Sequence, residues 1–185
     1  MGISRAKRIT FKFFSLFSAV RGYNILVLIC AQYLAAIFIF SPTRSLKEVL
    51  FDLHLFFVIL ATVFVIAGGY IINNFYDVKV DKINRPVKAG LDNYIKQATK
   101  LRLYFLLNFI GFCLGFLIST RAAFFFAVYI FSIWFYSHKL KKYPFIGVLS
   151  ATILTILPFF AIFVYFRNFS EIIFVYAIFL FLVIM

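Results

Sequence analysis

The sequence predicts an all-α fold, a polytopic transmembrane helix bundle with five full spans, an incomplete sixth and a cytoplasmic N-terminus. Three observations support this fold class. Of the 185 residues, 65% are hydrophobic and 29 are Phe, and the mean hydropathy is +1.04. Several uncharged runs reach the roughly 20 residues with which an α-helix crosses a bilayer. Phe, Ile and Leu also follow one another instead of alternating with polar residues, which argues against a membrane β-barrel.

The uncharged runs define the spans of a single membrane domain, residues 1–185. Ser41-Pro42 ends the first span, and Gly68-Gly69 in the second would let another helix approach closely. Pro158 interrupts the fifth, and we expect the carbonyl that it frees to be met by Thr155 or by a neighbouring helix. The last run has 14 residues, which is short for a span. The runs are 22–43, 53–76, 103–120, 122–137, 143–166 and 172–185.

Basic residues are unevenly distributed between the two sides of the predicted bundle. Fifteen of the 19 Lys and Arg residues lie in the N-terminal segment, in 77–102 and just after residue 137; the alternate loops hold four. This asymmetry places the N-terminus and the loop 77–102 in the cytoplasm of an inner or plasma membrane protein. A net charge of +13, confined to short segments between apolar runs, favours membrane lipids and an anionic ligand at one face over nucleic acid.

The stretch GYIINNFYDVKVDKINRPVKAG joins the second span to its basic loop. On a helix, its Asn73, Asp77 and Asp81 share one face, and Pro86 favours a helix end just before it. Two carboxylates so close to hydrocarbon need a cation, and Lys79 and Lys82 lie on other faces. Mg²⁺ fits, because it binds oxygen ligands and bridges carboxylates to phosphates. The alternative is that both acids are simply solvated loop residues.

Three motifs resemble the UbiA family of intramembrane prenyltransferases. NNFYDVKVDKINRP resembles the first Asp-rich motif of that family, NxxxDxxxD. RGYN, beginning at Arg21, resembles its N-terminal Arg-Pro-x-Asn motif, with Gly22 in place of Pro. YSHKLKKYPFIG resembles its Tyr-and-Lys loop, although Val148 follows Gly147 where the family usually has Asn. Within the family, the chain is most similar to members that act on glycerol-phosphate lipids.

The resemblance implies a transferase that moves a polyprenyl group from prenyl diphosphate to a lipid or aromatic acceptor, with its active site facing the cytoplasm. Mg²⁺, the implied cofactor, would be held by Asn73, Asp77 and Asp81. The implied catalytic residues are Asp77, Asp81 and Lys141. Lys139 and Lys141, with Lys142 or Arg21, would neutralise the leaving diphosphate, and the Tyr-to-Lys spacing leaves open which lysine has the family role. The residues implied to contact substrate are Arg21, Asn24, Asn73, Arg85, Tyr136 and Lys139.

Two features depart from the family pattern. Asn74 stands where many members have another Asp, which leaves one carboxylate fewer. Members also have about nine spans and a second Asp-rich motif, for which this sequence has no counterpart. We consider three explanations: a fragment of a longer protein, a half that pairs with a second chain supplying the remaining helices, or an inactive membrane scaffold.

Other functions receive less support from the sequence. An ion or metabolite carrier would place its carboxylates near the membrane midplane and would show inverted repeats, which are not apparent here. There is no Cys/His cluster for zinc, no Gly-rich phosphate loop and no Ser/His/Asp arrangement. Gln32, in the middle of the first span, is best interpreted as an interhelical hydrogen-bonding residue, and Asn24 as a site residue.

Overall fold

The computed structural model of the protein describes residues 16–84, 86, 90 and 95–185. The elements within these residues are helical, and most are long. They are α2 (Gly22–Ala35), the π-helical turn η1 (Ala36–Phe40), α3 (Leu46–Leu50), α4 (Leu53–Asn84), α6 (Gln97–Ile118), α7 (Thr120–His138), the 3₁₀ turn η2 (Leu140–Lys142), α8 (Pro144–Phe166) and α9 (Glu171–Ile184).

Five helical segments are long and apolar enough to cross a membrane, which confirms the predicted fold class. The first is formed by α2 together with η1, and the others by α4, α6, α7 followed by η2, and α8. α9 is a shorter apolar helix, in agreement with the incomplete sixth span. Both α4 and α6 extend beyond their uncharged runs, because charged residues outside the apolar core also favour helix. The predicted loop 77–102 therefore contains two helix ends.

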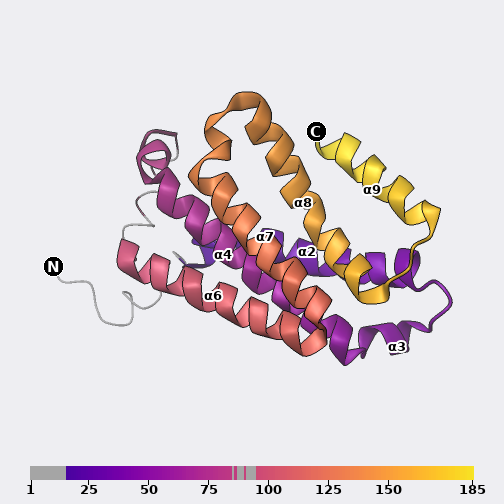
Figure 1. The fold of residues 1–185 in the computed structure, drawn as a ribbon. Coiled ribbons are helices and arrows are strands. Elements are labelled where there is room, and N and C mark those ends of the chain that lie inside the picture. The colour runs from indigo at the N-terminus through magenta and orange to yellow at the C-terminus, as the bar shows by residue number, and fades with distance from the viewer. Residues whose placement is uncertain (1–15, 85, 87–89, 91–94) are drawn as a thin grey trace.

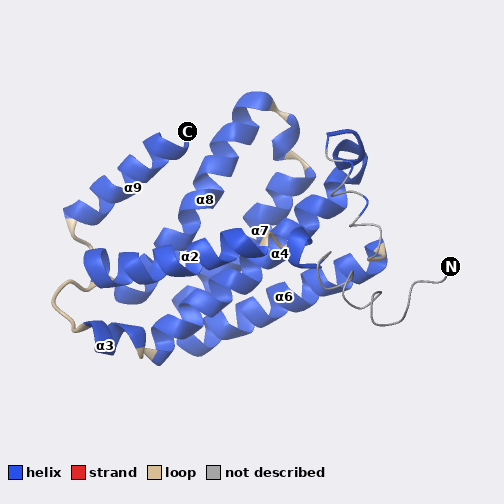
Figure 2. Cartoon of the chain, turned by 180° about the vertical axis from the view of Figure 1, so that it is seen from behind, coloured by secondary structure: helices blue, strands red, loops and turns tan. Residues whose placement is uncertain are grey.

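α4 is the central helix of the bundle. In its apolar stretch 61% of the residues are buried, against 22% in α2 and in α6. It packs most extensively against α6 and also contacts α7, α8 and α2. α7 and α8 cross in front of the bundle in Figure 1, whereas α2 lies at the back and is seen in front in Figure 2. This arrangement brings α2, α4, α7 and α8 around one interior space.

Glycines allow α4 and α6 to pack closely. A Cβ atom on Gly111 of α6 would lie 2.8 Å from Val65 Cγ2 and 3.2 Å from the backbone oxygen of Ala61, both on α4. A Cβ on Gly68 of α4 would lie 2.9 Å from Asn108 Nδ2 on α6. Small residues at such contacts let helix backbones approach, which supports membrane helix association through packing.

Pro158 leaves the carbonyl of Leu154 without its usual helical donor, because proline has no backbone N–H. The hydroxyl of Tyr129 on α7 donates to this carbonyl at 3.1 Å. Thr155, the other donor considered for it, instead donates to the Ala151 carbonyl at 2.8 Å. A neighbouring helix therefore satisfies the freed group, and the hydrogen bond joins α7 to α8.

Asp52 holds together the end of the bundle opposite residues 77–102. Its Oδ1 accepts hydrogen bonds from the backbone N–H groups of His54 and Leu55, at 3.0 and 3.1 Å, and so caps α4. Its Oδ2 accepts a 2.7 Å hydrogen bond from the Tyr165 hydroxyl and lies 3.5 Å from Arg44 Nη1. One carboxylate thus connects α4, α8 and the loop after η1.

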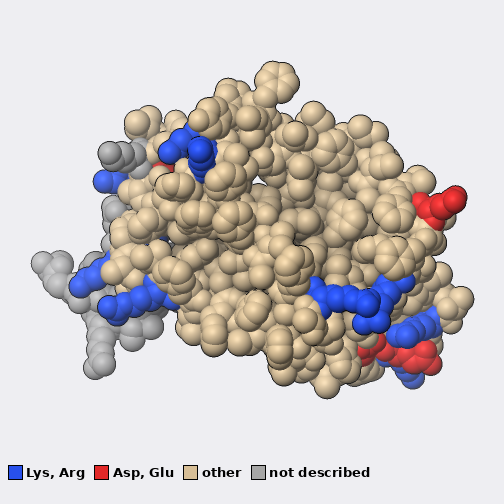
Figure 3. All heavy atoms as spheres, in the orientation of Figure 1, with Lys and Arg blue, Asp and Glu red and all other residues tan. Residues whose placement is uncertain are grey.

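The visible surface is consistent with a membrane bundle. In Figure 3 charged side chains gather toward the two ends of the molecule, and the surface between them is uncharged. Many large apolar side chains are exposed, including Phe109 at 67%, Phe116 at 64% and Leu182 at 67%. Exposed apolar surface on this scale is stable in lipid and not in water.

Candidate active site

Lys141 joins the first two residues of the Asp-rich motif. Its Nζ donates a hydrogen bond to Asn73 Oδ1 at 3.0 Å and forms an ion pair with Asp77 Oδ1. Asn73 and Asp77 lie one turn apart on the same face of α4, as the four-residue spacing predicted. The Lys141 and Asp77 side chains are 18% and 25% exposed, so the pair is only partly screened by solvent. This lysine comes from 64 residues further along the chain.

The turn η2 is positioned for this contact by close packing against α8. A Cβ on Gly147 of α8 would lie 3.3 Å from the Leu140 oxygen, the Lys141 Cα and the Lys141 oxygen. Pro144 occupies the first position of α8, where its missing N–H costs no helical hydrogen bond. Gly147 therefore lets the Lys141 backbone lie directly against the first turn of α8, within reach of α4.

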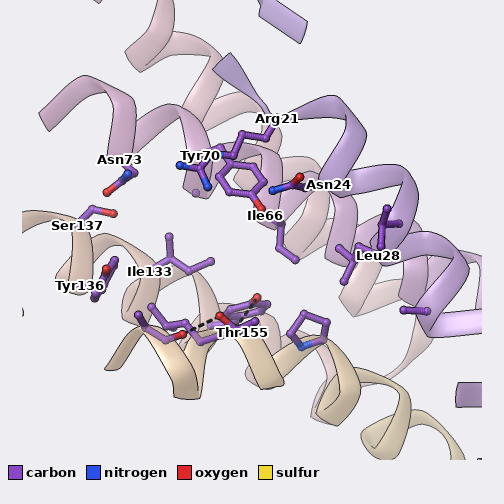
Figure 4. Close-up of a pocket in the computed structure, with 17 residues that line it drawn as sticks. Arg21, Asn24, Leu28, Ile66, Tyr70, Asn73, Ile133, Tyr136, Ser137 and Thr155 are labelled. Atoms are coloured by element: carbon purple, nitrogen blue, oxygen red, sulfur yellow. Dashed lines mark hydrogen bonds between the residues drawn. The ribbon is translucent and has the colours of Figure 1, made fainter. Parts of the chain in front are cut away.

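A cavity of about 530 Å³ lies beside this cluster, between α2, α4, α7 and α8. Figure 4 shows Asn73, Tyr136 and Ser137 on one side of the cavity, Arg21 and Asn24 along its upper edge, and Thr155 across the cavity from them. Apart from the tyrosines, the large apolar wall residues are Val27, Leu28, Ile66, Ile133 and Leu154. The cavity therefore combines a charged head with a hydrocarbon-like interior, the arrangement that a polar headgroup on an apolar tail requires.

Arg21 stands at the mouth of the cavity in a special backbone conformation. It is the N-cap of α2 and has φ of 51°, in the left-handed region. Its guanidinium lies 5.2 Å from the ring centroid of Tyr70 on α4, a cation–π contact. Next to it, a Cβ on Gly22 would lie 2.1 Å from the Phe17 ring, so a larger residue there would require this ring to move. Arg21 and Asn24, two of the residues predicted to contact substrate, both line the cavity.

The other predicted site residues differ in how they lie relative to the cavity and the Asp-rich motif. Tyr136 lines the cavity from α7. Asp81 is half-buried and lies one turn beyond Asp77 on the same helix. Lys139 is exposed at the C-cap of α7, and neither it nor Lys141 lines the cavity; Lys141 is the lysine that contacts the motif, through Asn73 and Asp77. Arg85 lies outside the described residues.

Asn74 points away from the Asn73–Asp77–Lys141 cluster. It is 4% exposed, and its Oδ1 accepts a 2.7 Å hydrogen bond from Lys100 Nζ on α6, itself 3% exposed. An Asp at position 74, as in many relatives, would face this buried lysine. Position 74 therefore belongs to the contact between α4 and α6 and not to the Asn73–Asp77–Lys141 contacts.

Sequence reasoning did not assign four polar residues of the cavity wall to the site, namely Tyr70, Tyr129, Ser137 and Thr155. Tyr70 could have been found, because Ile66, Tyr70, Asn73 and Asp77 follow one helical face at steps of four, three and four. Ser137 gave no such signal. It is 1% exposed and lines the cavity, and its hydroxyl has no hydrogen-bond partner among the residues that the structure describes.

Fold and cavity together define the class of this molecule: a multi-pass integral membrane protein with a carboxylate–lysine cluster at the head of an apolar cavity. The chain belongs to the UbiA prenyltransferase family, whose sequence model matches residues 31–185. The match covers most of the helical bundle, including the Asp-rich motif and Lys141.

Individual relatives agree with the family assignment. A digeranylgeranylglyceryl phosphate synthase from Methanobrevibacter smithii is 31% identical over 74% of this chain and 47% of its own length. One from Thermococcus gammatolerans is 35% identical over 48% of this chain and 32% of its own length. A solved structure of digeranylgeranylglyceryl phosphate synthase matches 94% of this chain and 58% of its own, with 22% identity and a TM-score of 0.75, and so shares the fold. The chain spans less than half the length of these two curated relatives.

Proposed function

We propose that the protein transfers a polyprenyl group from a prenyl diphosphate to a lipid acceptor of the glycerol-phosphate type. The observation that carries the proposal is the convergence of Asn73, Asp77 and Lys141 at the polar end of an apolar cavity. A diphosphate needs cationic and metal-binding groups, and its prenyl tail needs hydrocarbon walls. The names of the relatives favour a glycerol-phosphate lipid as the acceptor over an aromatic one.

The donor set at the head of the cavity fits Mg²⁺. Asn73 Oδ1 and Asp77 Oδ1 already converge on one cation, the ammonium group of Lys141. Amide and carboxylate oxygens are the ligands that Mg²⁺ prefers, and it usually binds through one or two carboxylates, waters and substrate phosphates. Asn73, Asp77 and Asp81 would hold the ion. Bound there, it would neutralise charge on the diphosphate as the leaving group departs.

The remaining residues have separate roles in this proposal. In the reaction the bond between the prenyl C1 and the diphosphate oxygen breaks, the diphosphate keeps the electron pair, and C1 bonds to the acceptor as the acceptor loses a proton. Lys141 and Arg21 stabilise the negative charge that develops on the diphosphate. Ile133 and Leu154 surround the tail and exclude water from the allylic cation. Tyr70 and Tyr136 line the same space.

The proposed site faces the cytoplasm. Lys141 lies in the turn between α7 and α8, with two further basic residues, Lys139 and Lys142. The N-terminal segment and residues 77–102 hold most of the other basic residues. The positive-inside rule then orients this end of the bundle inward.

A binding experiment tests the donor site. The full chain in lipid nanodiscs is titrated with geranylgeranyl diphosphate, with and without Mg²⁺. Asp77→Asn should lower the Mg²⁺-dependent affinity at least about tenfold, since even outer-sphere partners of a metal contribute that much. The matched control is Glu171→Gln, the same carboxylate-to-amide change at the far end of the bundle, which should bind as wild type. Equal affinity in Asp77→Asn and wild type would contradict the donor site.

A further inference from the structure

The lining of the cavity can be followed inward along three of its four helices. Counting inward from the charged head, its wall on α2 ends with Ala31, on α4 with Ile66 and on α8 with Pro158. One step further inward, α2 presents Gln32 and α4 presents Thr62. Gln32 is 3% exposed and Thr62 is 0% exposed, so polar side chains are buried directly behind the last apolar wall residues.

Gln32 binds two other helices at this level. Its Nε2 donates to the Pro158 carbonyl on α8 at 2.9 Å and to Thr62 Oγ1 on α4 at 3.4 Å. Thr62 in turn donates to the Val58 carbonyl at 2.8 Å. The contact confirms the interhelical role predicted for Gln32. It also joins α2 to α8 at the inner end of the cavity, whose walls these two helices form nearer the charged head.

We propose that Gln32 is the inner stop of the cavity and sets the longest prenyl chain that the donor site accepts. This inference rests on the proposed function, since it assigns a tail to the cavity. A tail that fills the space from Asn73 to Pro158 meets the Gln32 amide next. To pass, it would have to break the hydrogen bonds to Pro158 and Thr62 and leave buried polar groups without partners.

The contact of Gln32 with Pro158 and Thr62, called the bridge below, can be tested by substituting Gln32. Gln32 Oε1 is buried without a hydrogen-bond partner among the described residues, so the amide is not fully satisfied where it stands. Gln32→Ala removes the stop and extends the cavity inward. Ala31→Leu, a change at the last α2 residue of the wall, fills the inner end instead and keeps the bridge. The two variants should therefore change chain-length preference in opposite directions.

The experiment measures binding of geranyl, farnesyl, geranylgeranyl and geranylfarnesyl diphosphate to the full chain in nanodiscs with Mg²⁺. In Gln32→Ala the preferred length should increase, and affinity for the first donor too long for wild type should rise at least about tenfold, because one more isoprene unit is buried. In Ala31→Leu the preferred length should decrease. Gln97→Ala, an exposed Gln at the start of α6, is the matched control and should leave the profile unchanged.

The outcomes separate this inference from the proposed function. If no donor binds wild type in a Mg²⁺-dependent way, the proposed function fails. If the donors bind but Gln32→Ala and Ala31→Leu both keep the wild-type length profile, the tail leaves the cavity elsewhere and the stop is refuted while the donor site stands. Should Gln32→Ala fail to fold, an unchanged profile in Ala31→Leu is enough to overturn the inference.

Discussion

At the scale of single residues, Lys141 decides how the candidate site is charged. Asp77 is only a quarter exposed and, next to hydrocarbon, needs a compensating charge. In this structure Lys141 supplies it and also satisfies Asn73. A bound metal would take over both oxygens and release the lysine toward the diphosphate. Lys141 would thus serve as a counter-ion to the empty motif and as a ligand to the loaded one.

Lys141→Met tests this dual role. The variant leaves Asp77 partly buried without its cation, so the free energy of unfolding should fall by about 1 kcal/mol, between the values typical of exposed and buried pairs. Mg²⁺ should then raise the thermal midpoint of Lys141→Met more than that of wild type, because no ammonium group competes for the oxygens. Lys142→Met, exposed in the same turn, is the control. An identical Mg²⁺ response in both variants would argue against a shared cation position.

Asp52 lies at the end of the bundle opposite Lys141, where its hydrogen bonds stabilise the fold. Asp52→Ala removes the cap of α4 and the hydrogen bond from Tyr165. The free energy of unfolding should decrease by about 1–3 kcal/mol, the combined effect of a lost cap and a buried hydroxyl without its acceptor. Thermal unfolding in detergent measures this change. Tyr165→Phe removes one contact and should show a smaller loss, and donor affinity of the folded fraction should be normal in both variants.

At the scale of elements, apolar runs were enough to predict the spans. The run 53–76 falls within α4 and the run 143–166 starts one residue before α8, because uninterrupted hydrophobic stretches of that length have few alternatives in a membrane. Helix ends were less predictable, since α6 begins at Gln97 and includes Lys100, whose charge suggested a loop. The turn η2 was not predicted, because its position depends on packing against Gly147 rather than on local sequence.

In the candidate site too, features set by neighbouring residues were predictable, whereas contacts between residues far apart in the sequence were not. The face formed by Asn73, Asp77 and Asp81 follows from helical spacing and was predicted. Which lysine reaches it depends on a contact across 64 residues, and the Gln32–Pro158 bridge spans 126. Neither pairing has a signature in one sequence, because each is set by how the helices cross.

The contact between η2 and α8 yields a prediction at the element scale. In Gly147→Leu, the new side chain would press on the backbone of Leu140 and Lys141, which leaves no room for it. The turn should move and Lys141 should lose its contact with α4, so donor affinity should fall on the order of tenfold. Circular dichroism should show unchanged helix content. Val148→Leu, at an exposed neighbouring position, should bind donor normally. Normal binding by Gly147→Leu would show that η2 does not position Lys141.

At the scale of the whole molecule, one end carries the proposed donor site and the other holds helices of the bundle together. The Lys141 cluster and Arg21 lie at the end of the cavity nearest η2, whereas Asp52 connects α4 and α8 at the opposite end. Between them, α9 packs on α8 through the buried residues Ile173 and Ala177 and exposes most of its other apolar side chains. The two ends lie on opposite sides of the membrane. The orientation of the bundle therefore decides from which side a diphosphate can reach the proposed site.

Cysteine labelling tests the orientation. Cys30 and Cys113 are first replaced by Ala, and one cysteine is then introduced at Lys142, in η2, or at Lys47, in α3; both positions are exposed. In inside-out vesicles a membrane-impermeant maleimide should label Lys142→Cys and spare Lys47→Cys, because the positive-inside rule predicts that the basic end faces the cytoplasm. Right-side-out vesicles should reverse the result, and detergent should expose both sites. If Lys47→Cys is the one labelled in inside-out vesicles, the diphosphate site opens to the other side of the membrane, and a cytoplasmic pool of prenyl diphosphate could not reach it directly.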